Sequence, residues 1–262
     1  MNQKKLINKK IIISAAANGI GWSIAQECMS NGAIVYITDK NNESLEKISK
    51  HKLHEKQLFL DKVNSENFKE VENYFNKIKD KVDSIDALIN NVGIAGPTGK
   101  LEELNINDWK ETLDININSH FYFTKFSIPL LKNNNGGSII NLSSTAGLFG
   151  FPLRSPYATS KWAIIGMTKT LAMELGENNI RVNAICPGAV AGDRMKRVIK
   201  AKAQSLGVKE ESLQKDYESM VSLKSFVDKK DIANMVVFLL SEEAQKISGQ
   251  VMSVDGNTER MN

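Results

Sequence analysis

The stretch Ile11-Ile12-Ile13-Ser14-Ala15-Ala16-Ala17-Asn18-Gly19-Ile20-Gly21 decides the fold of this chain. It begins with three β-branched apolar residues, a pattern typical of a parallel strand that is buried on both faces. A turn containing Gly19 and Gly21 follows, and a helical pattern continues from there to about Asn31. Glycines in such a strand–turn–helix unit let backbone N–H groups approach a phosphate at the helix N-terminus. Because two glycines after a strand also make an ordinary tight turn, the rest of the chain must decide.

Strand and helix patterns alternate along the remaining sequence. Further strands are predicted at 33–38, 57–60, 87–91, 138–142, 181–186 and 250–254. With the first strand they predict an α/β fold, namely a Rossmann-type doubly wound parallel sheet of about seven strands with helices on both faces. Long helices are expected at 107–132 and 156–178, and a charged helical insertion at 193–222. Since no repeat or low-complexity linker divides the sequence, residues 1–262 are predicted to form a single domain.

The composition excludes several classes of function. The net charge is +4 and the lysines are scattered, so nothing indicates nucleic-acid binding. The apolar run 11–17 is too short for a signal peptide or a membrane span. Two cysteines give no disulfide framework, and three dispersed histidines predict no metal site. We therefore expect a cytoplasmic protein without metal, nucleic-acid or membrane partners.

Tyr157 and Lys161 form a candidate catalytic pair in the predicted helix 156–178. Residues at i and i+4 share a helix face, so the phenol and the ammonium point into the same space. The ammonium favours the phenolate and lowers the phenol pKa from about 10, as a general base near neutral pH requires. Taken alone, the pair could equally arise by chance on a solvated helix face.

Asp39 ends the second predicted strand, about twenty residues after the glycine turn. A carboxylate at this point can accept a hydrogen bond from an adenosine ribose hydroxyl and repel a 2′-phosphate. Lys40 favours a phosphorylated cofactor slightly, but the charge of Asp39 lies at the hydroxyl itself. The pattern therefore predicts NAD as the cofactor, with a carboxylate that caps the next turn as the alternative.

Six pieces between Ser14 and Gly256 resemble the short single-domain branch of the short-chain dehydrogenase/reductase family. The first turn resembles the family's Thr-Gly-x-x-x-Gly-x-Gly, with Ser14 in place of Thr and Ala15 in place of the first Gly. The other pieces are Asn90-Asn91-Val92-Gly93 for Asn-Asn-Ala-Gly, Asn116 for the helix asparagine, Ser144 for the serine thirteen residues before Tyr157, Pro187-Gly188 for the Pro-Gly turn, and Val254-Asp255-Gly256 for the last strand ending. Any one of these pieces is a weak signal, but all six in the family's order are specific to the family.

The resemblance implies hydride transfer between NAD and a secondary alcohol or ketone. It assigns Tyr157 as the proton acceptor, Lys161 as the group that lowers the Tyr157 pKa and holds the nicotinamide ribose, and Ser144 as a donor to the substrate oxygen. It assigns Asn116 to interrupt its helix and to hold a water that relays protons from Lys161. The implied NAD-binding residues are Ser14, Asn18, Gly19, Ile20, Gly21, Asp39, Asp61, Lys62, Asn90, Gly93, Tyr157, Lys161, Pro187, Gly188 and Val190.

Two departures from the family pattern carry expectations of their own. Ala15 has a Cβ where the turn usually has none, which should shift the loop or weaken cofactor binding. Gly192 stands where the family often has a threonine that touches the nicotinamide carboxamide, so a looser hold on that group is expected.

Arginines near the predicted site indicate the substrate. Arg154 lies three residues before Tyr157, and Arg194 opens the insertion. Because a guanidinium pairs bidentately with carboxylate or sulfonate, we expect Ser144, Tyr157 and these arginines to bind a small polar or anionic hydroxy compound. A solvated basic loop is the alternative.

Other functions and the state of assembly stay open at this point. The rival functions are an NADP-dependent reductase of 3-oxoacyl thioesters and a non-catalytic dinucleotide-binding sensor. A sugar-nucleotide epimerase would need a longer chain. The resemblance also implies a homotetramer or homodimer that pairs through helices 107–132 and 156–178, with Trp162 as an interface candidate.

Overall fold

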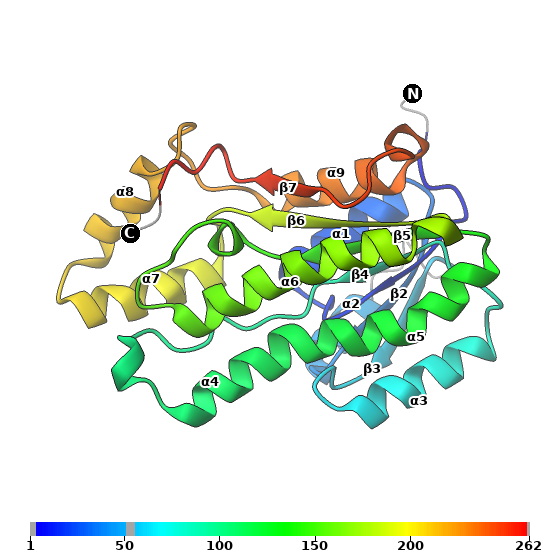
Figure 1. Cartoon of the computed structure of the whole chain (residues 1–262), viewed down its shortest axis with the longest axis horizontal. Coiled ribbons are helices and arrows are strands. Elements are labelled where there is room, and N and C mark those ends of the chain that lie inside the picture. Colours follow the sequence, from blue (N-terminus) through cyan, green and yellow to red (C-terminus); the bar gives the residue numbers. More distant parts are fainter. Residues whose placement is uncertain (1–3, 51–55, 261–262) are drawn as a thin grey trace.

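The computed structural model describes residues 4–50 and 56–260, and its centre is a seven-stranded parallel sheet (Figure 1). The strand order is β3-β2-β1-β4-β5-β6-β7, so the chain reverses direction across the sheet between β1 and β4. This order confirms the predicted Rossmann-type doubly wound fold. The strands are β1 (Lys10–Ile13), β2 (Ile34–Asp39), β3 (Leu58–Lys62), β4 (Ala87–Asn90), β5 (Gly137–Leu142), β6 (Ile180–Pro187) and β7 (Val251–Val254).

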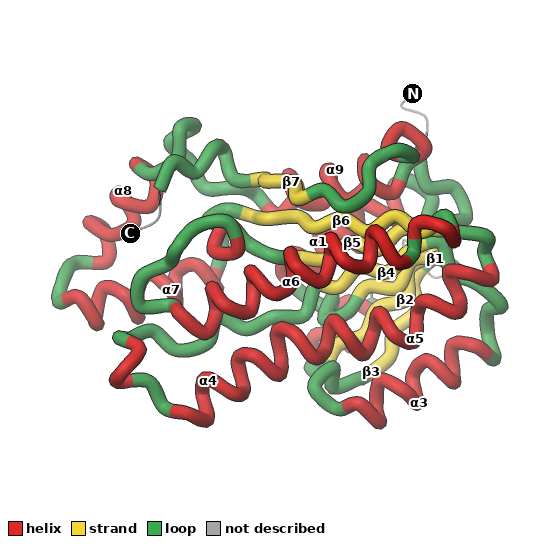
Figure 2. Tube along the Cα trace, viewed as in Figure 1, coloured by secondary structure: helices red, strands yellow, loops and turns green. Residues whose placement is uncertain are grey.

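Helices cover both faces of the sheet (Figure 2). One face packs against α1 (Gly19–Ser30), α2 (Asn42–Ser49) and α9 (Lys229–Leu240), and the other against α3 (Phe68–Lys79), α5 (Ser119–Asn133) and α6 (Ser155–Glu174). The run of isoleucines in β1 is explained by burial on both faces of the sheet. Ile11 and Ile13 point into the first layer and Ile12 into the second, and all three are fully buried.

The two long predicted helices are shorter than expected. The segment 107–132 is α4 (Ile106–Leu113), a π-helical turn (Asp114–Asn118) and then α5. The predicted helix 156–178 stops at Glu174, and a 3₁₀ turn at Gly176–Asn178 follows it. The other short turns are Leu101–Glu103, Thr145–Gly147 and Glu242–Ala244. The π turn is the most informative of these turns for function. Such turns interrupt the regular hydrogen bonding of an α-helix and are frequent at functional sites.

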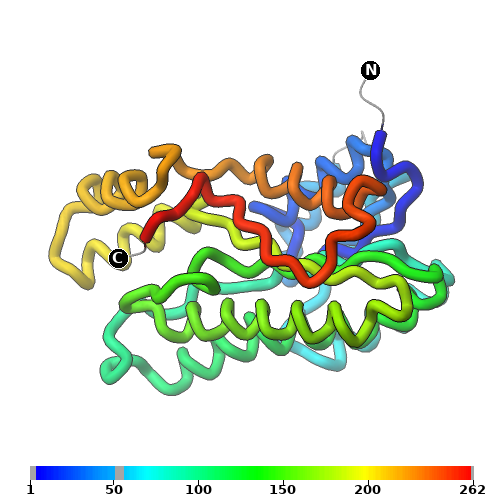
Figure 3. The backbone as a smooth tube through the Cα atoms, turned by 45° about the horizontal axis from the view of Figure 1, so that its top comes forward, coloured from blue at the N-terminus to red at the C-terminus, as the bar shows by residue number. Residues whose placement is uncertain are grey.

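The predicted insertion contains two helices, α7 (Asp193–Leu206) and α8 (Glu210–Ser219). They lie beyond the carboxyl ends of β6 and β7 (Figures 1 and 3). Ile199, Leu213 and Tyr217 form a small apolar cluster there, against which Phe151 from the loop before α6 packs. Within residues 4–50 and 56–260, no helix has the length and apolar character needed to cross a membrane.

Candidate active site

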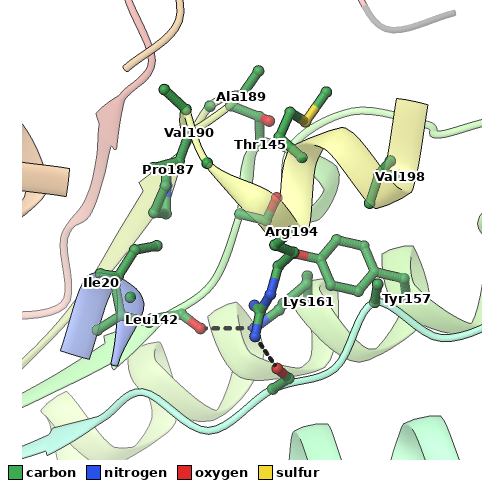
Figure 4. Close-up of a pocket in the computed structure, with 18 of the residues that line it drawn as sticks. Ile20, Leu142, Thr145, Tyr157, Lys161, Pro187, Ala189, Val190, Arg194 and Val198 are labelled. Atoms are coloured by element: carbon green, nitrogen blue, oxygen red, sulfur yellow. Dashed lines mark hydrogen bonds between the residues drawn. The ribbon is translucent and has the colours of Figure 1, made fainter. Parts of the chain in front are cut away.

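A cavity of about 540 Å³ lies at the carboxyl ends of the strands, where the order of the sheet reverses. This is the position at which open α/β sheets bind ligands. The wall combines the β1–α1 turn, the ends of β4, β5 and β6, and the first turns of α6 and α7 (Figure 4). The predicted site residues on the wall are Asn18, Gly19, Ile20, Gly93, Ser144, Arg154, Tyr157, Lys161, Pro187, Gly188, Val190 and Arg194.

Tyr157 and Lys161 face the cavity from the first turns of α6. The Lys161 Nζ lies 5.7 Å from the centroid of the Tyr157 ring and donates a hydrogen bond of 2.9 Å to the Leu142 carbonyl oxygen. Pro156 is accommodated at the start of this helix, where its missing N–H costs no hydrogen bond. Gly147 has no room for a Cβ, because that atom would lie 2.8 Å from the Lys161 carbonyl oxygen. Without a side chain at Gly147, the loop after β5 packs against the backbone of α6 at Lys161. This packing brings Ser144 beside Tyr157 and Lys161.

The phenol of Tyr157 has a pKa below its ordinary value of 10. Burial alone raises that pKa, but the charge of Lys161, the nearby Ser144 hydroxyl and the charges of Arg194 and Arg154 together outweigh burial. The pKa of Lys161 is also lowered, chiefly by burial, while a Tyr157 anion raises it. The lowered pKa of Tyr157 favours its phenolate form beside Lys161.

Asn116 lies in the π turn and is fully buried, off the cavity wall. Its Oδ1 accepts a hydrogen bond from the Ile94 N–H at 2.8 Å, and its Nδ2 donates to the Ile94 carbonyl and to the Ser160 Oγ. A Cβ at Gly93 would lie 3.3 Å from the Lys161 Nζ and 3.4 Å from the Asn116 Oδ1, so both side chains converge on this glycine. Asn116 thus holds the loop that follows β4 against Lys161.

The turn after β1 is shaped to accept an anion. Gly21 has no space for a side chain, because a Cβ would lie 2.6 Å from the Asn91 Nδ2 and 2.7 Å from the Ala16 Cα. Gly19 has φ +60°, with nothing within 4 Å of an added Cβ. α1 has no side-chain cap and no acidic residue in its first turn, so its terminal N–H groups stay available.

Ala15 adopts φ +49°, the left-handed region in which a Cβ costs about 1 kcal/mol. The departure from glycine is therefore a source of backbone strain in this turn.

Asn91 contacts this turn and the cavity, whereas Asn90, predicted to bind the cofactor, lies off the cavity wall. Asn91 Nδ2 donates to the carbonyl oxygens of Ala15 and Ser14 at 2.8 and 3.2 Å, and its backbone N–H donates to the Ser14 Oγ. Asn90 is fully buried and donates to Thr124 and Asn141. Successive residues of a strand point to opposite faces, and the motif alone did not tell which asparagine would face the turn.

The acidic residues at the ends of β2 and β3 lie outside the cavity wall. Asp39 is buried and accepts hydrogen bonds from the N–H groups of Ala17 (3.0 Å) and Asn41 (2.9 Å). It therefore fixes both the glycine turn after β1 and the turn after β2. Lys40 forms an ion pair of 2.6 Å with Glu66. Asp61 pairs with Lys77 from α3. Lys62 lies beside Asp39 in the register of β2 and β3.

Two arginines lie near Tyr157 and Lys161. Arg154 is 2% exposed, and its guanidinium carbon lies 5.2 Å from the centroid of the Tyr157 ring. Its Nη2 donates to the Ala95 carbonyl oxygen at 2.6 Å. Arg194 reaches from α7 toward Lys161 and donates to the Gly93 carbonyl oxygen at 2.8 Å (Figure 4). The contact ties the start of α7 to the loop that follows β4.

Gly192 and His120 are two further features near the site. Gly192 has φ +137°, which a threonine would rarely adopt, so the departure from the family pattern alters the backbone before α7 as well as removing a hydroxyl. His120 is fully buried, and its Nε2 donates to the Val92 carbonyl oxygen at 3.0 Å. Burial, aided by the charge of Lys161, lowers the His120 pKa to about 3, so this imidazole stays neutral.

Known proteins resemble this chain over nearly its whole length. Residues 15–257 match the family model described as enoyl-(acyl carrier protein) reductase. A short-chain dehydrogenase/reductase of Botryotinia fuckeliana is 32% identical over 264 residues, which cover 98% of each protein. A 3-oxoacyl-acyl-carrier-protein reductase of Thermotoga maritima is 32% identical over 257 residues, 96% of this chain and 98% of that protein.

Solved structures have the same fold as this chain and match it over nearly its whole length. NAD⁺-bound xylitol dehydrogenase superposes with a TM-score of 0.91 at 27% identity, over 97% of this chain and all of that one. ElxO with NADP bound gives a TM-score of 0.86 at 28% identity, over 95% and 98% of the two chains. With its glycine turn, its Tyr-x-x-x-Lys helix and its matched length, this chain belongs to the short-chain dehydrogenase/reductase family of oxidoreductases.

Proposed function

We propose that this protein transfers hydride between NAD and the carbinol carbon of a small secondary alcohol, or the matching ketone in reverse. The observation that carries the proposal is the placement of Ser144, Tyr157 and Lys161 on one cavity wall that continues into the glycine turn. A non-catalytic dinucleotide sensor would not need a phenol whose pKa is lowered beside an ammonium.

Each protein group has a defined task in this reaction. The Tyr157 phenolate accepts the proton from the substrate hydroxyl, or the phenol returns it to the ketone oxygen. Lys161 stabilises the phenolate, and its bond to the Leu142 carbonyl keeps the ammonium in place. The Ser144 hydroxyl donates to the substrate oxygen as charge develops there. Asn116 positions the Gly93–Ile94 backbone and holds the water through which Lys161 exchanges protons.

The chain fits a nicotinamide dinucleotide. The uncapped start of α1 and the crowded Gly21 form a cradle for a pyrophosphate. Ser14, Asn18, Gly19 and Ile20 complete that turn, and Gly93, Pro187, Gly188 and Val190 would flank the nicotinamide. Asp39, with Asp61 and Lys62 on the next strand, would hold the adenosine end. When bound, the cofactor supplies the hydride acceptor or donor.

Asp39 should make the enzyme prefer NAD over NADP. Its carboxylate would repel a 2′-phosphate, and the neighbouring Lys40 is already paired with Glu66. Like charges brought together cost several kcal/mol, so we expect kcat/KM for NAD to exceed that for NADP by about 10²-fold. In Asp39→Asn, which keeps the shape and an acceptor oxygen, the preference should fall at least about tenfold. Steady-state assays with both cofactors measure it.

Asp80→Asn, at the exposed end of α3, is the matched control and should leave the cofactor preference unchanged. A wild-type enzyme that uses NADP as well as NAD would contradict the assignment and favour the rival NADP-dependent reductase of 3-oxoacyl thioesters. Binding of NAD without turnover of any alcohol would favour the sensor.

We also propose that the protein assembles as a homodimer or homotetramer through α5 and α6. Apolar side chains are exposed on these helices: Phe121 is 50% exposed, Trp162 51% and Met173 85%. Large apolar side chains left in water favour association. Light scattering on the eluted protein should give a mass of two or four chains, and Trp162→Glu should lower it. A monomer at assay concentration would exclude the proposal.

A further inference from the structure

We propose that the substrate carries a carboxylate or sulfonate, held by Arg154 in a subsite that also contains Tyr217. The inference rests on the proposed function, because it names the class of alcohol that enters the same cavity. Sequence patterns indicated arginines near the site. The structure adds that one of them, Arg154, is enclosed between aromatic rings from the loop before α6 and from α6 itself.

Arg154 is a buried cation with unused hydrogen-bonding capacity. Its Cζ lies 5.4 Å from the Phe151 ring centroid and 5.2 Å from that of Tyr157, so aromatic faces enclose the guanidinium. Its Nη2 donates to the Ala95 carbonyl oxygen, whereas its Nε has no hydrogen-bond partner. No carboxylate among the described residues forms an ion pair with Arg154, although a buried charge is costly unless it is paired. Because Arg154 lies on the cavity wall, an anionic ligand can supply that partner.

Tyr217 adds a hydroxyl suited to an anion, and Lys202 adds positive charge behind the cavity wall. Tyr217, from α8, lies on the cavity wall, and its buried hydroxyl has no hydrogen-bond partner. Lys202, from α7, is 2% exposed, and its Nζ lies 5.4 Å from the Tyr217 ring centroid and 5.3 Å from that of Phe151. Burial lowers the pKa of Lys202, and the nearby charge of Arg154 lowers it further. The positive charge of Lys202 therefore adds to that of Arg154 on this side of the cavity.

The cavity wall as a whole carries an excess of positive charge. Among the described residues it holds six basic side chains against one carboxylate, Asp193; the basic ones are Arg154, Lys161, Arg194, Arg197, Lys229 and Arg260. The cofactor phosphates belong at the glycine turn, whereas Arg154 lies beside the Tyr157 ring. The excess positive charge near the reacting carbon therefore remains to be matched by the substrate.

The test pairs each anionic alcohol with a neutral counterpart of the same shape. Small hydroxycarboxylates are compared with their carboxamides and hydroxysulfonates with their sulfonamides, so the two arms also tell which anion the site takes. A charge-assisted hydrogen bond is worth about 10- to 100-fold in affinity, so the parent should prefer the anion by that factor in kcat/KM. Arg154→Gln should remove the preference through KM, Arg154→Lys should keep part of it, and Tyr217→Phe should lower it a few-fold.

Lys196→Gln removes an exposed charge of α7 that is off the cavity wall and should leave the preference intact. Equal use of charged and neutral partners by the active parent, or an unchanged preference in Arg154→Gln, overturns the subsite and leaves the proposed function standing. If nothing turns over, the proposed function fails, and calorimetry of the same anions on the NADH-loaded protein judges the subsite. In that case the subsite is overturned if the Arg154→Gln variant binds the anions as tightly as the parent does.

Discussion

Replacing Tyr157 by Phe is expected to lower kcat by about 10³-fold, because the substrate hydroxyl then has no group to accept its proton. The ring itself stays, so its packing against Arg154 and the binding of NAD should be preserved. Stopped-flow or steady-state absorbance of the reduced cofactor measures the rate, and fluorescence titration measures NAD binding.

Tyr74→Phe provides the matched control for loss of a phenol hydroxyl. Tyr74 is buried in the helical layer on α3, its hydroxyl has no hydrogen-bond partner, and it is far from the cavity wall. Its replacement should leave turnover unchanged. A Tyr157→Phe enzyme that oxidises its alcohol at the parent rate would remove the basis for the proposed reaction.

Replacing Lys161 by Met should lower turnover by about 10²- to 10³-fold and change its pH dependence. The phenolate is the active form for oxidation, so the rate rises as pH rises through the Tyr157 pKa. In the parent this pKa lies below 10, because cations led by Lys161 outweigh burial. Without the ammonium, burial is opposed only by Ser144 and the two arginines. The pKa rises, and the rising limb of the pH–rate curve must move to higher pH.

Lys169→Met, two turns further along α6, removes an exposed ammonium on the same helix and should change neither the rate nor the curve. A Lys161→Met enzyme that is slow but has the parental pH profile would mean that Lys161 only positions groups. In that case the tuning of Tyr157 by charge would be wrong.

Much of the fold was predictable because it depends on local pattern. The continuous apolar runs located all seven strands, and the spacing of Tyr157 and Lys161 placed both on one helix face. Right-handed crossovers favoured the doubly wound arrangement. The π turn at Asn116 agrees with the expected interruption, which came from the resemblance rather than from periodicity.

The contacts made by individual side chains were not predictable. Nothing in the sequence shows that Arg154 would donate to the Ala95 carbonyl or that Arg194 would reach Gly93, because both contacts join segments distant in the chain. Tyr217 and Lys202 were missed for a similar reason. They lie on two different helices of the insertion, and only the folding of α7 and α8 beside the loop before α6 brings them near Arg154.

The place of β1 between β2 and β4 has a consequence for how the protein is made. β1 leaves the ribosome first and finds β2 soon after, but its other edge pairs with Ala87–Ile89, which are synthesised much later. Until then the backbone N–H and C=O groups along that edge of β1 have no strand to pair with. The incomplete chain therefore exposes an edge at which it can pair wrongly until β4 is synthesised.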